Sequence, residues 1–513
     1  MSTRTPPEPE RAPIALPSPA PRSDWDAWGS TSAHLPAGAR AIVAALLPGK
    51  AHPVPRRDVP ALTPSRLVDA DLEALSAVVG PEHATTSDAV RLLHLGGKST
   101  PDLLARRLDD LQTAPDAVVS PSSHAETLAL LAVCDRRGIA VVPFGGGTSV
   151  VGGVDPDAGA QRAVIALDLA RTAGLHALDA ESLLATFGAG TTGPQAEELL
   201  GERGFTLGHF PQSFEYATIG GYAATRSSGQ ASRGYGRFDE LVHALRVATP
   251  TGELDLGRAP ASAAGPDLRQ LFLGSEGAFG VLPEVTVRIR PVPAATAYGA
   301  WSFPDFASGA AALRDVTQRG IRPTGLRLSD ETETRVNATR GGHFTRMRGC
   351  LAIATFEATT DADADAARAV VDAVFTAHGA KSRGEDPARS WERGRFASPA
   401  LRDTLLDGGV LAETLETATT WSNLAALKAA VTAALTKTLT DAGTKPVIMC
   451  HISHVYPAGA SLYFTCIAAL TSDPAAQWAA AKDAASRAIG DAGGTITHHH
   501  AIGRDHSPYL EDE

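Results

Sequence analysis

Residues 116–153 read DAVVSPSSHAETLALLAVCDRRGIAVVPFGGGTSVVGG, the most informative stretch of this sequence. Valine and isoleucine runs flank a segment with the apolar spacing of a helix, and Ser122 and Ser123 precede that segment as N-cap residues do. The stretch therefore predicts a strand, a serine-capped helix and a second strand that runs directly into glycines. We interpret this order as a βαβ-like opening of an α+β domain.

Outward from this stretch, short strands are predicted in RAVIALDL, LVHALRVATPTGEL and GVLPEVTVRIRPVP, the last ending at a proline-rich boundary. Later segments alternate strands with helices, which fits an antiparallel sheet with helices on one face. The predicted fold is α+β: a two-subdomain flavin-type domain, an α+β cap domain, and helical N- and C-terminal regions. The predicted divisions are a disordered proline-rich tail (1–22), a helical region (23–113), the first domain (114–293), the cap (294–470), and a C-terminal helix with a histidine loop (471–513).

Composition narrows the function classes. A chain of 513 residues exceeds the ~250–300 that one core usually supports, so two or more domains are expected. The net charge is −11 and no basic cluster is interleaved with aromatics, which argues against nucleic-acid binding. The four cysteines form no CxxC pair, as in reduced thiols, and no apolar run approaches the ~20 residues of a membrane span. Small-molecule chemistry is the better expectation.

The glycine-rich turn PFGGGTSVVGG, Pro143 to Gly153, follows a strand. Three adjacent glycines let backbone N–H groups approach a ligand with no Cβ in the way, so the turn can form a nest for an anion such as a diphosphate. It is neither the dinucleotide-binding GxGxxG nor a P-loop, because Thr148 and Ser149 stand where a lysine would follow. Taken alone, the turn is equally well explained as a purely structural one.

Two further segments carry the polar groups that a large cofactor needs. PQSFEYATIGGYAATRSSGQ (211–230) combines a glycine pair with hydroxyls and an arginine, and LFLGSEGAFGVLPEVTVRIRPVP (271–293) places a glutamate and glycines before a strand. In this order and spacing, the three segments resemble the PCMH-type FAD-binding domain of the vanillyl-alcohol-oxidase-like flavoenzymes.

The resemblance implies that FAD binds and assigns three groups of residues to it. FAD should be non-covalent, because the glycine turn lacks the histidine that tethers it in some relatives. The implied cofactor-binding residues are Pro143, Phe144, Gly145, Gly146, Gly147, Thr148 and Ser149 at the pyrophosphate; Gln212, Ser213, Thr218, Gly221, Thr225, Arg226, Ser227 and Ser228 at the flavin end; and Glu276, Gly277, Gly280, Val281 and Leu282 at the ribityl and ring region.

Within that superfamily, the chain from Asp24 onward is most similar to the alkyl-dihydroxyacetonephosphate synthase family. IRPTGLRLSDE resembles the segment whose arginine, here Arg327, is needed for activity, and LRDTLLDGGVLAETLETATTW resembles the segment whose arginine, here Arg402, binds the substrate headgroup. HISHVYPAGASLYF carries the match to the catalytic tyrosine at Tyr463. THHHAIG matches the active-site histidine loop, with His498, His499 and His500.

The three histidines allow other interpretations. A purification tag is disfavoured because AIGRDHSPYLEDE continues beyond them. A metal site stays open: on a strand, His498 and His500 would share one face, with His451 and His454 as further ligands. Metal-dependent hydroxy-acid dehydrogenases of this superfamily carry HVGDGNLH-like and EHGIG-like segments, whereas this chain has Tyr463 and His499 at two of those positions. The prediction is therefore a catalytic loop and no metal.

The implied activity is a redox-neutral exchange, in which a fatty alcohol replaces the fatty acid at C1 of acyl-dihydroxyacetone phosphate. Tyr463 would exchange the C1 proton, the histidines would deprotonate the alcohol, and Arg402 would hold the phosphate. The alternatives are an FAD-dependent dehydrogenase or oxidase of a 2-hydroxy acid or alcohol, and a flavoprotein retained only as a binding module.

The resemblance also implies partners and a location. The partners are a phosphorylated lipid, a fatty alcohol and a second copy of the chain in a homodimer, with peripheral membrane contact allowed and no nucleic acid. Without the eukaryotic targeting region or a peroxisomal signal, the expected location is cytoplasmic or membrane-peripheral. Three departures stand out: Gln212 replaces a usual acidic residue, the targeting region is missing, and the family's closing helix would come after Glu513, as in a truncated fragment.

Overall fold

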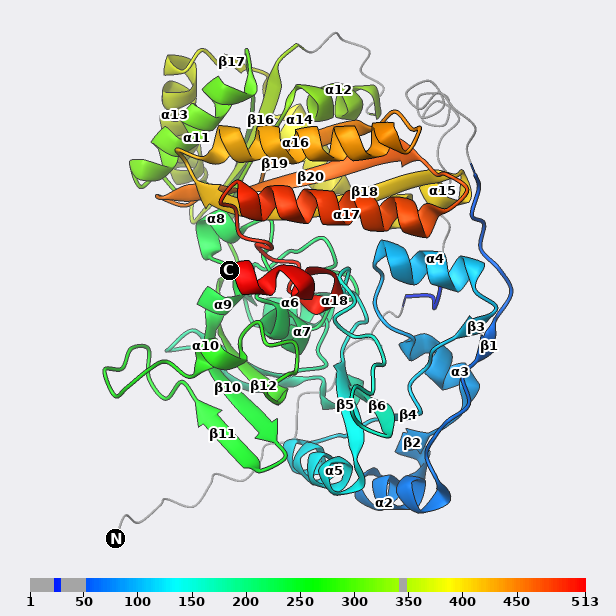
Figure 1. The fold of residues 1–513 in the computed structure, drawn as a ribbon. Coiled ribbons are helices and arrows are strands. Elements are labelled where there is room, and N and C mark those ends of the chain that lie inside the picture. Colours follow the sequence, from blue (N-terminus) through cyan, green and yellow to red (C-terminus); the bar gives the residue numbers. More distant parts are fainter. Residues whose placement is uncertain (1–22, 29–51, 341–347) are drawn as a thin grey trace.

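The computed structural model describes residues 23–28, 52–340 and 348–513 and has an α+β fold (Figure 1). The tail predicted for residues 1–22 lies outside the described residues. Strand β4 (Ala117–Val119), helix α5 (His124–Arg137) and strand β5 (Ile139–Phe144) follow the order predicted from residues 116–153. Ser123 is the N-cap of α5, accepting from the amide of Glu126 at 3.2 Å, and Gly138 ends the helix with φ 62°.

The first sheet is small and mostly parallel. Its order is β2-β4-β6-β5, with β6 (Ala163–Asp168) parallel to both β4 and β5 and the edge strand β2 (Ala84–Thr85) antiparallel. Because β6 is buried along its whole length, its sequence is uniformly apolar until Asp168. The glycine turn follows β5 at the carboxyl end of this sheet. Helix α2 (Asp69–Val79) packs on α5, and α3 (Asp88–Arg91) lies against β4. Helix α4 (Thr100–Leu108) instead packs on the cap, with Leu103 and Leu104 in the cap core.

A second, five-stranded antiparallel sheet completes the flavin-side domain. Its order is β11-β10-β12-β8-β7, and its inner face packs with short helices in one hydrophobic core. The strands are β7 (Leu175–Asp179), β8 (Leu184–Gly188), β10 (Val242–Thr249), β11 (Gly252–Leu256) and β12 (Val281–Arg288). The helices are α6 (Gly193–Gly201), α7 (Ile219–Thr225), α8 (Ser232–Tyr235), α9 (Phe238–Leu241) and α10 (Arg269–Phe272), with β9 (Phe205–Thr206) and β13 (Arg290–Pro291) forming a separate pair.

The upper half of the molecule in Figure 1 is the predicted antiparallel sheet, but the expectation of helices on one face is wrong, because α14 (Asp386–Gly394) and α15 (Ser398–Asp407) pack on the face opposite the main core. Its order is β17-β14-β16-β15-β19-β20-β18. The strands are β14 (Ala295–Phe303), β15 (Gly325–Ser329), β16 (Cys350–Ala358), β17 (Lys381–Ser382), β18 (Val410–Thr420), β19 (Val447–Ile452) and β20 (Gly459–Ala469). The main core of this half joins the sheet to α11 (Phe306–Gln318), α13 (Asp361–Ala377), α16 (Leu424–Asp441) and α17 (Pro474–Asp491).

The two-residue period of the strands sorts their side chains by face. Leu328, Ile452 and Leu462 belong to the core beneath the helices. Their strand neighbours Arg327 and Tyr463 therefore project from the opposite face, as does His451, next to Ile452. That face is the one turned toward the flavin-side domain (Figure 1).

The chain end returns between the two halves. After α17 ends at Asp491, Gly493 has φ 69°, and the chain then passes under the cap sheet to α18 (Gly503–His506) (Figure 1). Helix α12 (Glu331–Arg340) also belongs to the cap. None of the helices in the described residues combines the length and apolar character that crossing a lipid bilayer requires.

Candidate functional site: glycine cradle and histidine loop

The glycine turn packs directly against the segment that precedes α7. A Cβ on Gly145 would lie 2.4 Å from Thr218 Oγ1, and one on Gly146 would lie 1.9 Å from the Tyr216 carbonyl oxygen. Gly147 has φ +63°, the left-handed conformation that glycine tolerates best. The structure thus brings together the first two predicted cofactor segments, and we call residues 143–149 with 212–218 the glycine cradle.

Most of the polar residues predicted at the flavin end make hydrogen bonds to neighbouring parts of the protein. Thr218 caps α7, and the Thr225 hydroxyl donates to the Gly221 carbonyl at 2.9 Å. Arg226 is engaged locally, donating to the Leu273 carbonyl at 2.9 Å. Ser227 Oγ lies 3.1 Å from His209 Nε2.

Two buried oxygens beyond this cluster, Ser228 Oγ and Gln230 Oε1, have no hydrogen-bond partner in the described part of the chain. Orphaned buried polar atoms are costly unless a ligand or water satisfies them. Together with the close-packed cradle, they fit a large polar cofactor such as FAD.

The third predicted segment reaches the cradle by another route. A Cβ on Gly277 would meet the Pro143 ring at 2.8 Å, so this turn lies directly on the end of β5. Val281 and Leu282 point into hydrophobic cores at the start of β12, which leaves their backbone as the part able to face a cofactor. The Glu276 carboxylate accepts from the amides of Ile502 and Gly503 at 3.0 and 2.9 Å and so contacts the C-terminal loop.

Gln212, which replaces a usual acidic residue of the family, links the flavin-side domain to the cap. Its side-chain nitrogen donates to the Arg395 carbonyl at 2.6 Å. Phe214, two residues later, stacks on Phe396 with ring centroids 5.1 Å apart. This end of the cradle therefore contacts the cap between α14 and α15, and an amide serves there as a donor where a carboxylate could not.

On the cap sheet, Arg327 is held by two neighbours. Its Nη2 donates to Glu333 Oε1 at 2.7 Å, and its Nη1 lies 3.0 Å from His451 Nε2. The His451 ring stacks on Tyr463 with centroids 4.8 Å apart. Burial would raise the pKa of Glu333, but the charges of Arg327 and His451 hold this pKa well below its usual range. The site therefore contains an anchored guanidinium beside the predicted catalytic phenol.

Tyr463 is enclosed by the cap sheet and the histidine loop. Its ring lies 5.6 Å from that of His500 and 6.2 Å from that of His499, centroid to centroid. Burial raises the pKa of Tyr463 to about 12, while a hydrogen bond with Thr414 and the charge of Arg402 act in the opposite direction. The phenol is thus protonated at neutral pH and suited to relaying a proton rather than to holding a negative charge.

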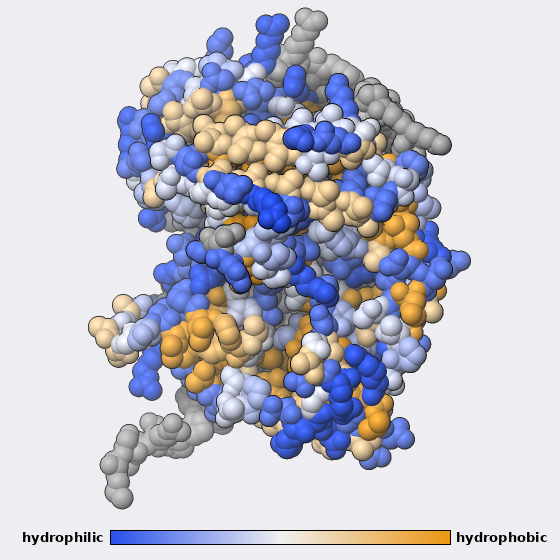
Figure 2. All heavy atoms as spheres, in the orientation of Figure 1, coloured by the Kyte–Doolittle hydropathy of each residue, from blue (hydrophilic) through white to orange (hydrophobic). Residues whose placement is uncertain are grey.

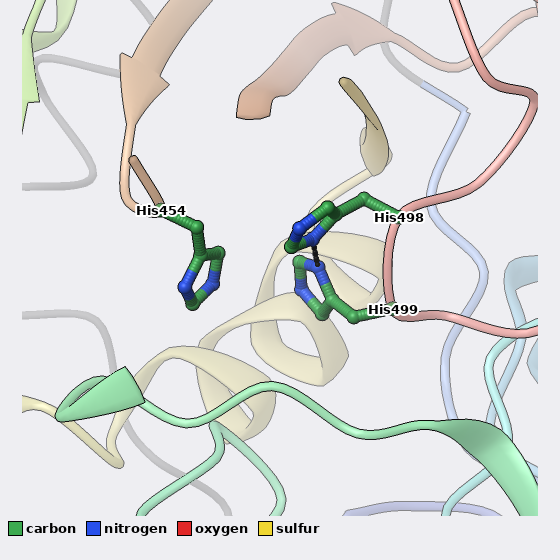
Figure 3. Close-up of side chains that lie close together, drawn as sticks. All are labelled: His454, His498 and His499. Carbon is green, nitrogen blue, oxygen red and sulfur yellow. Dashed lines mark hydrogen bonds between the residues drawn. The ribbon is translucent and has the colours of Figure 1, made fainter. Parts of the chain in front are cut away.

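The three histidines lie on a loop, so the strand alternation on which the metal alternative relied does not apply to them. His498 Nδ1 and His499 Nδ1 are 2.9 Å apart, within hydrogen-bond distance, and His498 Nε2 lies 2.7 Å from the Tyr456 hydroxyl. His454 faces this pair from the turn after β19, as Figure 3 shows, with ring centroids 5.0 Å from His498. Ligand atoms of His454, His498 and His499 all lie within 4.8 Å of one another, so the metal interpretation involves His499 rather than His500.

Burial governs the protonation of the loop. It lowers the pKa of His498 and of His499 to about 3 and that of His500 to about 4, with the charge of Glu416 opposing each shift. All three imidazoles are therefore neutral at pH 7. A neutral imidazole carries a lone pair that can accept a proton from an alcohol, and its lowered pKa makes it a weaker base than an exposed histidine.

Arg402, on α15, is near enough to Tyr463 for its charge to act on the pKa of that phenol. Its guanidinium donates to the Lys98 carbonyl and lies 5.9 Å from the Trp28 ring centroid, and its buried Nε has no hydrogen-bond partner in the described residues. The Lys98 ammonium, also buried, donates to the Asp24 carbonyl at 2.5 Å. Burial lowers the pKa of Lys98 to about 7. Arg402 thus contacts the backbone of Lys98, while the Lys98 ammonium is engaged with the 24–25 backbone, and the Arg402 Nε, unpaired within the described residues, is the donor left for a headgroup anion.

Several site residues were not singled out from the sequence. Glu416, Glu333, Tyr456 and His209 all contact predicted catalytic or cofactor residues. Of these, Glu416 could have been found from the sequence. It is a charged residue inside the stretch LAETLETATT, which lies in a long, largely buried strand, and a buried carboxylate requires a specific partner.

Comparison with protein-family models gives two matches. The description "FAD binding domain" matches residues 115–256, and "FAD linked oxidases, C-terminal domain" matches residues 292–513. They cover the flavin-side domain and the cap with its histidine loop, the two parts that meet at the candidate site.

Comparison with characterised proteins finds the alkyldihydroxyacetonephosphate synthase of Trypanosoma brucei brucei, 32% identical over 465 residues (86% of this chain, 75% of the relative). The one from Dictyostelium discoideum is 31% identical over 458 residues (85% and 75%). A mitochondrial cytochrome D-lactate dehydrogenase of Arabidopsis thaliana is 32% identical over 236 residues, covering 45% of this chain and 40% of the relative.

Among solved structures, an alkyldihydroxyacetonephosphate synthase aligns with a TM-score of 0.83 at 28% identity, covering 92% of this chain and 94% of the other. A p-cresol methylhydroxylase aligns with a TM-score of 0.63 at 14% identity, covering 85% and 89%, which shows a shared fold only.

Proposed function

The chain belongs to the FAD-dependent alkyldihydroxyacetonephosphate synthase family, and from this premise we propose that it exchanges the acyl group of acyl-dihydroxyacetone phosphate for a fatty alcohol. The exchange is redox-neutral: a C–O bond to the fatty acid breaks, one to the alcohol forms, and the proton lost by the alcohol leaves with the acid. No external electron acceptor takes part.

One observation carries this proposal. The cap-sheet residues Arg327 and Tyr463 and the histidine loop meet on the sheet face that is turned toward the glycine cradle, and Glu276 of the flavin-side domain contacts the same loop. A phenol, an anchored guanidinium and neutral imidazoles are the groups that moving a proton at C1 and activating an alcohol require.

We assign the following roles to the residues of this chain. When bound in the glycine cradle, FAD supplies the electron-accepting ring on which the exchange depends. Tyr463 relays the C1 proton, and an imidazole of His498–His500 accepts the proton of the incoming alcohol. Arg402 holds the phosphate, since a guanidinium can donate two parallel hydrogen bonds to it. Arg327, fixed by Glu333, orients the reacting end.

Incubating the purified FAD-loaded protein with acyl-dihydroxyacetone phosphate and a radiolabelled fatty alcohol tests this function. We expect an ether-linked, alkali-stable product, release of one fatty acid per ether formed, and no oxygen consumption. Absence of the ether product in the presence of bound FAD would refute the proposal.

A second candidate is a dehydrogenase of a 2-hydroxy acid. It is favoured by the three clustered imidazoles of His454, His498 and His499, and by the more distant likeness to a lactate dehydrogenase. It predicts anaerobic bleaching of the flavin band on addition of a 2-hydroxy acid. If the flavin spectrum stays oxidised when several 2-hydroxy acids are added, the chain is not a dehydrogenase of those acids.

We further propose the homodimer and the cytoplasmic or membrane-peripheral location expected for this family. An apolar groove between α11 and α16, lined by Phe306, Ala310, Trp421 and alanines of α16, is the surface available for such contacts. Figure 2 shows pale-orange, weakly hydrophobic residues across the outer helices of the cap. Analytical ultracentrifugation and co-sedimentation with anionic vesicles would test the two expectations separately.

The Arg402→Lys variant is expected to keep its fold and flavin but to raise KM for the phosphorylated substrate at least about 10-fold, because a point charge replaces a two-pronged donor. Steady-state kinetics at saturating alcohol measure the change. Arg487→Lys is the matched control, since Arg487 is exposed on α17, where it pairs with Asp483 and lies 5.8 Å from the Tyr509 ring centroid. Equal KM values for the two variants would remove Arg402 from the headgroup site.

A further inference from the structure

The carboxylate of Glu416 is bound by the histidine loop itself. Its Oε1 accepts from the Thr497 hydroxyl at 2.6 Å and from the amides of His499 and His500 at 3.0 and 2.8 Å, while its Oε2 accepts from the amide of His498 at 2.6 Å. Four donors from four consecutive residues therefore converge on one side chain.

This carboxylate is fully enclosed. The Glu416 side chain has 0% exposure, and its strand partner across the sheet is Tyr463. Burial of a charge is costly unless hydrogen bonds replace those of water, and four donors do so here.

Glu276 holds the same loop from the flavin-side domain, two residues beyond His500. The loop is therefore bound from above by the cap sheet and from below by the segment that packs on the glycine turn. The hydrogen bonds that residues 498–500 and 502–503 make to the two carboxylates come from backbone amides, while the imidazoles of His499 and His500 lie 3.4 and 3.9 Å from the Glu416 carboxylate.

We propose that Glu416 is the positioning residue of the reaction: it fixes the backbone of residues 497–500 and thereby aims the imidazoles at the site beside Tyr463. The inference rests on the proposed function for the role of those imidazoles.

Glu416→Gln is the sharpest test, because it keeps the shape but removes the charge and replaces one acceptor oxygen by an NH2 group facing an N–H donor. Glu413→Gln is the matched control: Glu413 is another buried carboxylate of β18, three residues away, but it faces the helices and accepts from the Trp478 indole. Glu416→Asp keeps the charge on a shorter side chain.

We expect Glu416→Gln to lower kcat for ether formation roughly 10–100-fold, the scale of misplacing a catalytic group. The KM for the acyl substrate, the FAD content and the Tyr463-dependent C1 proton exchange should stay near wild-type values. Hydrogen exchange at the amides of residues 498–500 should accelerate, Glu416→Asp should recover part of the activity, and Glu413→Gln should match wild type.

If Glu416→Gln forms the ether at the wild-type rate, the inference is wrong. It is also wrong if Glu416→Gln and Glu413→Gln lose the same activity and both lose FAD, because the loss would then follow from removing any buried carboxylate. If the wild-type protein itself makes no ether, the proposed function fails, and the amide exchange of residues 498–500 then decides by itself whether Glu416 positions the loop.

Discussion

Replacing His498, His499 and His500 together with alanine should lower ether formation by roughly 10²–10⁴-fold, the usual scale of removing a general base. FAD should stay bound, because the glycine cradle lies in the other domain. The loop should keep its path, since its hydrogen bonds to Glu416 and Glu276 come from backbone amides, which alanine retains, although the ring contacts of His499 and His500 with Glu416 are lost. Product analysis with labelled alcohol, alongside the C1 proton-exchange assay, separates loss of the alcohol step from loss of the whole site.

The control for this variant is His378→Ala, which removes a partly exposed imidazole that pairs with Asp315 on the outside of the cap. Elemental analysis of the same wild-type sample distinguishes a base from a metal ligand. About one equivalent of a transition metal, together with chelator-sensitive oxidation of a hydroxy acid, would contradict the synthase proposal and favour the dehydrogenase.

Gly146→Val should abolish retention of FAD. Even a Cβ at this position would lie 1.9 Å from the Tyr216 carbonyl, so the turn and the 212–218 segment must separate, which opens the glycine cradle. The expected loss comes from this steric clash and not from backbone strain, because Gly147, and not Gly146, has the left-handed backbone conformation. The flavin absorbance of the purified protein and its FAD content after gel filtration measure the effect.

The companion variant is Gly201→Val, on the exposed end of α6 in the same domain, where a Cβ would meet nothing within 4 Å. It should remain yellow and folded. A Gly146→Val protein that is fully loaded with FAD would show that this turn is not the cofactor site. Circular dichroism of both variants distinguishes loss of cofactor from loss of fold.

Much of the local structure could be predicted because it depends on neighbouring residues. The serine cap and the apolar spacing of residues 123–137 define α5, and alternation defines the cap strands. The histidine loop was harder to place, since its three identical polar residues carry no period. Only the fold shows that the segment after Gly494 is held as a loop by distant carboxylates, so that His498 and His499 meet His454.

The sequence alone determined the α+β class, the glycine turn at the end of a strand, and the residues able to carry acid–base chemistry, because each depends on residue type and short-range spacing. Tertiary structure alone decided that Arg327 lies beside His451, 124 residues away, and that Thr497 donates to Glu416 across 81 residues. The physical reason is that the loop is held mainly through backbone amides, which every residue except proline possesses and which therefore leave no mark on the sequence.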